Sequence, residues 1–190
     1  MNGAIAVAIL AGGRARRFPG KLEQPIGGRS MLAGVYEGAA ATGWPVYLVG
    51  TPPLLPSIEG IDARTIADAA PGTGPLQAFA AACAAIQEPL VVALAGDEPY
   101  VDAALLRDLE RCWVAGDEAV VPRHDGGIEP LVALYDRRAV LRESAAATNA
   151  GASMHALIRR LRVRYVPTPQ RYFANVNTPD DFARVQRERA

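Results

Sequence analysis

The sequence has few of the residues that several specialised protein classes need. Among its 190 residues there are only two cysteines, Cys83 and Cys112, and two histidines, His124 and His155. The cysteines are far apart in sequence, which argues against a disulfide framework and against a zinc site. Neither histidine has a serine or cysteine arranged beside it as a nucleophile pair, so no hydrolase triad is indicated, and we interpret both as structural or surface residues.

Net charge is also absent, because 20 basic residues balance 20 acidic ones. Dedicated nucleic-acid-binding proteins usually carry excess positive charge that replaces phosphate counterions, so we expect small-molecule ligands and no nucleic acid. The apolar residues 1–10 are too few to span a membrane and lack the basic start and cleavage site of a signal peptide. We therefore expect a cytoplasmic protein without membrane association, folded as a single domain over residues 1–190.

What the sequence does have is a series of short apolar runs that alternate with helical segments. Strands of a buried sheet are predicted for residues 4–10, 46–49, 64–66 and 90–94. Segments rich in alanine and leucine predict helices at residues 30–42 and 75–86. This alternation predicts an α/β fold with a doubly wound, mostly parallel sheet.

The second half of the chain follows a looser pattern. It predicts a helix at residues 103–113, a strand at 119–122, and a further segment at 128–135 that can pair with that strand. We expect a small antiparallel part there. Residues 178–181, Thr-Pro-Asp-Asp, predict the start of a last helix, because Thr caps a helix, Pro fits its first turn, and two acids complement its dipole.

A Gly-rich, basic loop follows the first predicted strand, from Leu10 to Lys21, with the sequence LAGGRARRFPGK. Glycines let backbone N–H groups curl around an anion, and four cations within eight residues can neutralise it, so phosphate is the natural ligand. The spacing fits neither the P-loop nor the dinucleotide fingerprint. The alternative is a flexible surface loop with solvated arginines. Its position at the carboxyl end of a buried strand favours a ligand site.

Asp97 stands just past the predicted strand at residues 90–94. If that strand lies beside the first one, Asp97 faces the phosphates of the Gly-rich loop and can share Mg²⁺ with them. The alternative is a turn or helix-capping aspartate. We expect the neighbouring Glu98 to point elsewhere on an extended chain, which makes it the weaker candidate.

Two further candidates follow the weak strand at residues 64–66. Asp68 stands at its end, where it could accept a hydrogen bond from a base or ribose, or could simply belong to a turn. Gly74 lies in the segment Gly-Thr-Gly-Pro-Leu that opens the next helix, where free N–H groups suit an anion or a polar base edge. A plain helix-entry turn is equally compatible with that segment.

Five segments together resemble the MobA-like nucleotidyltransferases, and the resemblance extends over nearly the whole chain. The loop LAGGRARRFPGK is similar to the family signature, and LAGDEPYV to its metal-binding strand end. The other three are GTGPLQAF, HDGGIEPLVALYDRRAV and FANVNTPDDF. The last of these favours the members that act on the molybdenum cofactor over relatives that act on sugar phosphates or terpenoid precursors.

The resemblance implies a Rossmann-like nucleotide-diphospho-sugar transferase fold and a Mg²⁺-dependent reaction. GMP would pass from GTP to the phosphate of molybdopterin, with release of pyrophosphate. Lys21 and Arg17 would contact the phosphates, Asp97 the Mg²⁺, and Asp68 the guanosine. Asn175 and Asn177 would lie near a metal or the acceptor. Nucleotide contacts are also expected from Leu10, Ala11, Gly12, Gly13, Arg14 and Gly74.

This chain departs from the family pattern in the loop, where Phe18-Pro19 replaces Met-Gly and Gly20 replaces the usual Asp before the lysine. Related reactions therefore stay open, with CTP as donor or another phosphorylated acceptor such as phospholactate. A different class of function, a non-catalytic nucleotide sensor or an adaptor that delivers the cofactor, also stays open. Molybdoenzymes or other proteins of cofactor biosynthesis are the partner proteins that the resemblance suggests.

Overall fold

The computed structural model describes residues 4–12, 18–50, 63–68, 72–146 and 153–188. Its centre is a sheet with the strand order β10-β7-β9-β6-β1-β4-β5. Strand β8 pairs with the C-terminal end of β7. The strands are β1 (Ile5–Leu10), β4 (Val46–Val49), β5 (Arg64–Ile66), β6 (Leu90–Ala95), β7 (Ala119–His124), β8 (Gly127–Ile128), β9 (Val132–Asp136) and β10 (Val163–Pro167). A separate two-stranded hairpin joins β2 (Pro25–Ile26) and β3 (Arg29–Ser30).

The predicted mixture of parallel and antiparallel pairing is confirmed. Strands β5, β4, β1 and β6 are parallel neighbours, whereas β9 runs antiparallel to both β6 and β7. The short β7–β8–β9 connections explain the reversal, because parallel neighbours need a long crossover. The predicted pairing of residues 128–135 with 119–122 is observed in the register Val120↔Leu134.

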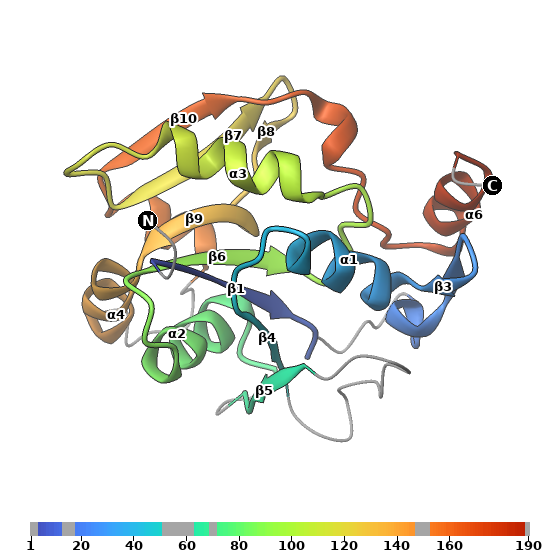
Figure 1. The fold of residues 1–190 in the computed structure, drawn as a ribbon, viewed down its shortest axis with the longest axis horizontal. Coiled ribbons are helices and arrows are strands. Elements are labelled where there is room, and N and C mark those ends of the chain that lie inside the picture. Colours follow the sequence, from blue (N-terminus) through green and yellow to red (C-terminus); the bar gives the residue numbers. More distant parts are fainter. Residues whose placement is uncertain (1–3, 13–17, 51–62, 69–71, 147–152, 189–190) are drawn as a thin grey trace.

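Helices cover both faces of the sheet (Figure 1). Helices α1 (Met31–Ala40) and α3 (Ala103–Cys112) pack on one face, and α2 (Pro75–Ala85), α4 (Arg137–Ala146) and α5 (Met154–Ile158) on the other. Alternate residues of β1 therefore enter two different cores, with Ala6 and Ala8 in one and Val7 and Ile9 in the other. This two-sided burial explains why the strand is apolar throughout.

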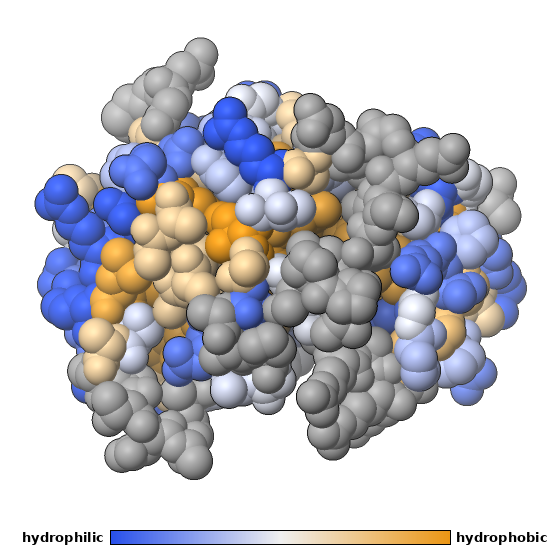
Figure 2. Space-filling view, turned by 90° about the horizontal axis from the view of Figure 1, so that it is seen from below, coloured by the Kyte–Doolittle hydropathy of each residue, from blue (hydrophilic) through white to orange (hydrophobic). Residues whose placement is uncertain are grey.

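The surface on the α2 side is apolar toward its middle, and hydrophilic residues gather toward its two ends (Figure 2). Helix α6 (Pro179–Glu188) stands apart from the layers, near the β2–β3 hairpin (Figure 1). Two 3₁₀ turns complete the described elements, η1 (Lys21–Glu23) and η2 (Gln170–Tyr172). Within the described ranges, no helix has both the length and the apolar character that a bilayer crossing requires.

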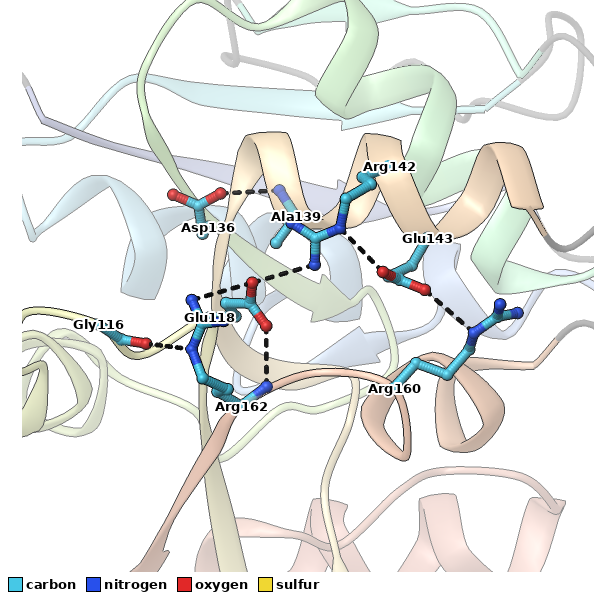
Figure 3. A network of polar contacts seen from close by, with 8 residues as sticks. All are labelled: Gly116, Glu118, Asp136, Ala139, Arg142, Glu143, Arg160 and Arg162. Carbon is cyan, nitrogen blue, oxygen red and sulfur yellow. Dashed lines mark hydrogen bonds and ion pairs between the residues drawn. The ribbon is translucent and has the colours of Figure 1, made fainter.

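An ion-pair network fastens the outer strand β10 to the rest of the fold (Figure 3). At its centre Glu118, with 7% of its side chain exposed, accepts hydrogen bonds from Arg142 Nη2 at 3.0 Å and from the backbone N–H of Arg162 at 2.9 Å. Burial raises the pKa of Glu118, but these hydrogen bonds and the two positive charges outweigh it, so the net pKa is lowered. The carboxylate is therefore stabilised as an anion.

We expect Glu118→Gln to lower the free energy of unfolding at pH 7 by about 1–2 kcal/mol, since charged hydrogen bonds become neutral ones. A lowered folded-state pKa stabilises the protein above the unfolded value of about 4.3, and this contribution disappears as the pH falls through the folded value. Denaturant unfolding at pH 7 and pH 3 should therefore show a larger difference between wild type and variant at pH 7 than at pH 3. Glu110→Gln on α3 is the control, and an equal difference at both pH values would contradict a role for the charge.

Candidate active site

The site lies where β1 and β6 end side by side. The two strands are parallel with Leu10 opposite Ala95, and Gly96 N–H donates to the carbonyl of Leu10 at 3.1 Å. A Cβ on Gly96 would lie 3.3 Å from that carbonyl oxygen and 3.2 Å from a methyl group of Leu32, so any larger residue would have to push these neighbours back. The chain therefore leaves both strands at one edge of the sheet, which brings the start of the Gly-rich loop next to the Gly96–Asp97 turn.

Lys21 reaches Asp97 because of a turn that precedes it. Gly20 has a φ of 71°, in the left-handed region that glycine adopts readily, and Lys21 then begins η1. The Lys21 ammonium forms an ion pair with Asp97, and 12% and 19% of the two side chains are exposed. It also donates to the carbonyl of Val176 at 2.7 Å and to Asn177 Oδ1 at 3.3 Å.

The other predicted nucleotide contacts lie along the same sheet edge. Leu10 ends β1, Ala11 follows it with its N–H bonded to the carbonyl of Val49 at 2.9 Å, and Gly12 comes next. Asp68 is buried after β5 and its N–H donates to the carbonyl of Gly50 at 3.2 Å. Gly74 caps α2 with a φ of 108°. The predicted residues Gly13, Arg14 and Arg17 lie outside the described residues.

The structure thus brings Lys21, Asp97 and Asn177 into contact. Asn175 is partly exposed, two residues before Asn177, and is not among the hydrogen-bond partners of Lys21. Asp68 and Gly74 approach from the β5 side of the sheet and are not bonded to Lys21 or Asp97.

A small apolar cluster supports the site from the side of the C-terminal helix. It contains the buried side chains of Ile26, Met31, Val176 and Val185, with Phe18, Leu22, Tyr100 and Phe182 packed around them. The ring of Phe18 contacts that of Phe182 edge to face, with centroids 5.8 Å apart. The Phe18 that departs from the family pattern therefore attaches the end of the Gly-rich loop to α6.

Asp181 of α6 orders the backbone that meets Lys21. Its Oδ2 accepts hydrogen bonds from the backbone N–H groups of Asn177 at 3.1 Å and Thr178 at 3.0 Å, and from the Thr178 hydroxyl at 2.8 Å. Thr178 in turn accepts from the N–H of Asp181 at 3.2 Å. This reciprocal pairing is a capping box, and it fixes the segment that carries Asn177 and the Val176 carbonyl.

We expect Asp181→Ala to lower stability by about 1 kcal/mol, the usual effect of losing a helix cap. The Asn177 segment is then free to move away from Lys21, so kcat/KM should fall by about tenfold. This fall corresponds to a loss of about 1.4 kcal/mol of transition-state stabilisation. Steady-state kinetics and thermal unfolding measure the two effects. The exposed neighbour Asp180→Ala is the matched control, and equal kinetics of the two variants would contradict this role.

Glu98 is the first feature that the sequence reasoning placed wrongly. The chain turns at Gly96–Asp97 instead of running on extended, and Glu98 is only 1% exposed. Burial, together with the charges of Asp97 and Glu129, raises its pKa to about 9 although Lys21 lowers it. Its Oε2 has no hydrogen-bond partner among the described residues, which costs about 1–3 kcal/mol. The site keeps this carboxyl group at the expense of stability.

Glu129 and His124, which sequence reasoning did not select for the site, form a hydrogen-bonded pair, and the charge of Glu129 acts on Glu98. His124, interpreted above as structural or surface, has 8% of its side chain exposed and lies 2.8 Å from Glu129 Oε1. Its ring stacks on Phe173, with centroids 5.2 Å apart. The available signal was the predicted pairing of residues 128–135, which brings Glu129 toward the same sheet edge.

Comparison with known families agrees with this arrangement of strands and loops. A sequence profile described as the MobA-like NTP transferase domain matches residues 7–165. The chain belongs to this family. It is therefore a nucleotidyltransferase, as the resemblance in the sequence implied.

Relatives of this MobA-like NTP transferase include full-length matches. It is 33% identical over 201 residues to a probable molybdenum cofactor guanylyltransferase of Opitutus terrae, which covers 98% of this chain and 97% of that one. The crystal structure of molybdopterin-guanine dinucleotide biosynthesis protein A from Archaeoglobus fulgidus matches with a TM-score of 0.75 and 27% identity, covering 96% and 97%. A shorter match, 35% identical over 61% of this chain and 50% of the other, is a 3-deoxy-manno-octulosonate cytidylyltransferase of Methylococcus capsulatus.

Proposed function

We propose that this MobA-like NTP transferase moves GMP from GTP to the phosphate of molybdopterin, which forms the guanine dinucleotide and releases pyrophosphate. The observation that carries the proposal is the Lys21–Asp97 ion pair at the neighbouring ends of β1 and β6. It presents an ammonium group for phosphate and a carboxylate for Mg²⁺ side by side. The names of the two full-length relatives support molybdopterin as the acceptor.

The residues at this site fit Mg²⁺ that arrives with a nucleotide. Among the residues that the structure describes, no group of three or more His, Cys, Asp or Glu side chains could hold a metal ion. Mg²⁺ usually binds through one or two carboxylates and completes its shell with water and substrate phosphates. Asp97 supplies such a carboxylate, and Asn177 adds an amide oxygen close to Lys21. When bound, the ion would withdraw charge from the phosphate oxygens as a Lewis acid.

The two substrates would lie over different halves of the sheet. Leu10, Ala11 and Gly12 end β1, and Asp68 and Gly74 stand beyond β5, so the nucleoside would lie over β1, β4 and β5. Gly13, Arg14 and Arg17 would contribute to the same side from the loop. The acceptor would then approach over β6 and β9, and the two phosphates would meet at Lys21 and Asp97.

The reaction is an in-line displacement at the α-phosphorus of GTP. A terminal phosphate oxygen of the acceptor forms the new P–O bond, the bond to the β-phosphate oxygen breaks, and pyrophosphate leaves with the electron pair. The nucleophile is already anionic, so the protein needs no strong general base. Lys21 and Arg17 would neutralise the phosphates, and the Val176 carbonyl and Asn177 would hold Lys21 in position.

A reaction with CTP is the nearest alternative, and the shorter match to a cytidylyltransferase is the observation that favours testing it. A nucleotide that binds the folded state raises the melting temperature by mass action. We therefore expect GTP with Mg²⁺ to raise it more than CTP or ATP at the same concentration. A larger rise of the melting temperature with CTP would contradict GTP as the donor and would indicate the cytosine dinucleotide as the product. An adaptor without catalytic activity would bind nucleotide and release no pyrophosphate when the acceptor is added.

A further inference from the structure

A second acidic residue lies across the sheet from Asp97. In the antiparallel β6–β9 pair, Leu94 is opposite Val132, and the N–H of Ala95 donates to the carbonyl of Leu131 at 2.8 Å. Asp97 follows Ala95 by two residues and Glu129 precedes Leu131 by two, so both leave this strand pair at the same edge of the sheet. Glu129 therefore stands on the β9 side of Asp97, whereas Lys21 comes from the loop that follows β1.

His124 holds Glu129 in one orientation. The backbone N–H of Gly126 donates to His124 Nδ1 at 3.0 Å, so the ring proton is on Nε2, which donates to Glu129 Oε1 at 2.8 Å. The ring stacks on Phe173 with an interplanar angle of 21°. Glu129 Oε2 makes no hydrogen bond with the described residues, and 20% of the side chain is exposed. One carboxylate oxygen is thus fixed and the other is available to a ligand.

Glu98 completes this acidic side of the site. It is 1% exposed, its Oε2 lacks a partner among the described residues, and its carboxyl group lies within electrostatic reach of Asp97 and Glu129. In the described part of the chain, the only lysine or arginine paired with any of these three acids is Lys21. Glu129 itself has no lysine or arginine partner among the described residues, so it repels phosphate and suits N–H donors, and the part of the acceptor that faces it is not its phosphate.

We propose that Glu129, oriented by His124 and backed by the buried Glu98, binds the ring system of the acceptor through adjacent N–H donors. A 2-amino-4-oxopyrimidine edge, which a pterin presents, offers two such donors; Oε2 would accept one, and Oε1, which has a second lone pair beside the His124 bond, would accept the other. The inference rests on the proposed function, in which the acceptor carries a pterin. Guanine presents the same edge, so the nucleotide is the second source of this chemistry, and kinetics must separate the two.

Glu129→Gln is the direct test, because the amide replaces one acceptor oxygen by a donor at nearly unchanged size. We expect its KM for molybdopterin to rise by about ten- to a hundredfold while the KM for GTP stays within twofold. The neighbouring Asp125→Asn, on the exposed turn between β7 and β8, is the matched control. An unchanged KM for molybdopterin, or a raised KM for GTP in its place, would overturn the assignment.

Gly126→Ala tests the role of His124 without changing any charge. A Cβ at this position would lie 2.8 Å from His124 Cε1 and 3.1 Å from Nδ1, so the ring must shift. We expect a smaller rise in the KM for molybdopterin and an unchanged KM for GTP. A KM for molybdopterin equal to that of the wild type would show that His124 does not position Glu129.

A binding measurement with a phosphate-free pterin separates this inference from the proposed function. The intrinsic fluorescence of the pterin reports its binding. Wild-type protein should bind the pterin and Glu129→Gln should bind it at least tenfold more weakly, even if no nucleotidyl transfer is detected. Equal binding by the two proteins, or no binding by either, would refute the pterin site. Failure of transfer with intact, Glu129-dependent pterin binding would refute only the proposed reaction.

Discussion

Asp97→Asn should lower kcat by about 10²- to 10³-fold, the usual effect of removing one preorganised charge from a site that stabilises a transition state. The substitution keeps the size of the side chain and removes the charge that would hold Mg²⁺. Lys21 retains its bonds to the Val176 carbonyl and Asn177, so its position should change little. Nucleotide binding without Mg²⁺ should therefore be preserved, and the increase in affinity that Mg²⁺ gives the wild type should be lost.

Pyrophosphate release at saturating Mg²⁺ measures this effect, and titration of nucleotide with and without Mg²⁺ measures the metal-dependent part. Asp102→Asn is the matched control, since Asp102 caps α3 on the same loop through a 2.9 Å bond from the Leu105 N–H. Asparagine caps a helix as well as aspartate does, so this variant should behave as wild type. An Asp97→Asn protein with more than a tenth of wild-type kcat would rule out Asp97 as the metal ligand.

Lys21→Met should lower kcat/KM by about 10²- to 10³-fold, with the KM for GTP raised as well as kcat lowered. Methionine keeps much of the aliphatic length and removes the ammonium group that we propose binds the phosphates. Part of the loss should appear in ground-state binding, because the triphosphate is charged before and during the reaction. Nucleotide titration and initial rates over a range of GTP concentrations separate the two parts.

Lys21→Arg gives the matched comparison, because it keeps the charge and changes its shape. The planar guanidinium cannot reproduce the three contacts of a compact ammonium with Asp97, Val176 and Asn177, so we expect only partial recovery. Circular dichroism and the melting temperature verify that both variants fold. Full activity in Lys21→Met would mean that phosphate binding depends on other groups of the Gly-rich loop.

The parts of the fold that could be predicted from the sequence are those with two-sided burial. Strand β1 lies in the middle of the sheet between β6 and β4, so its residues are apolar on both faces and its boundaries are evident. Strand β10 is at the edge of the sheet and carries Arg164 and exposed Tyr165, so no apolar run marks it. Helices α4 and α5 were also not predicted. Their shared partner α2 is remote in sequence, and α5 has only five residues.

The site could be predicted to the extent that it depends on strand order. Once residues 4–10 and 90–94 were placed side by side, Asp97 had to face the Gly-rich loop, and the β1–β6 pairing confirms that geometry. Glu98 could not be placed, because one turn at Gly96–Asp97 decides whether its side chain is buried. The role that we propose for His124 depends on tertiary contacts with Glu129 and Phe173, which the sequence does not show.

Incubation of the purified protein with GTP, Mg²⁺ and molybdopterin is the most direct test of the proposed reaction. We predict equal amounts of pyrophosphate and of the guanine dinucleotide of molybdopterin, and no product when the acceptor or Mg²⁺ is left out. GTP binding without pyrophosphate release in the presence of acceptor, or product formed with CTP and not with GTP, would contradict the assignment.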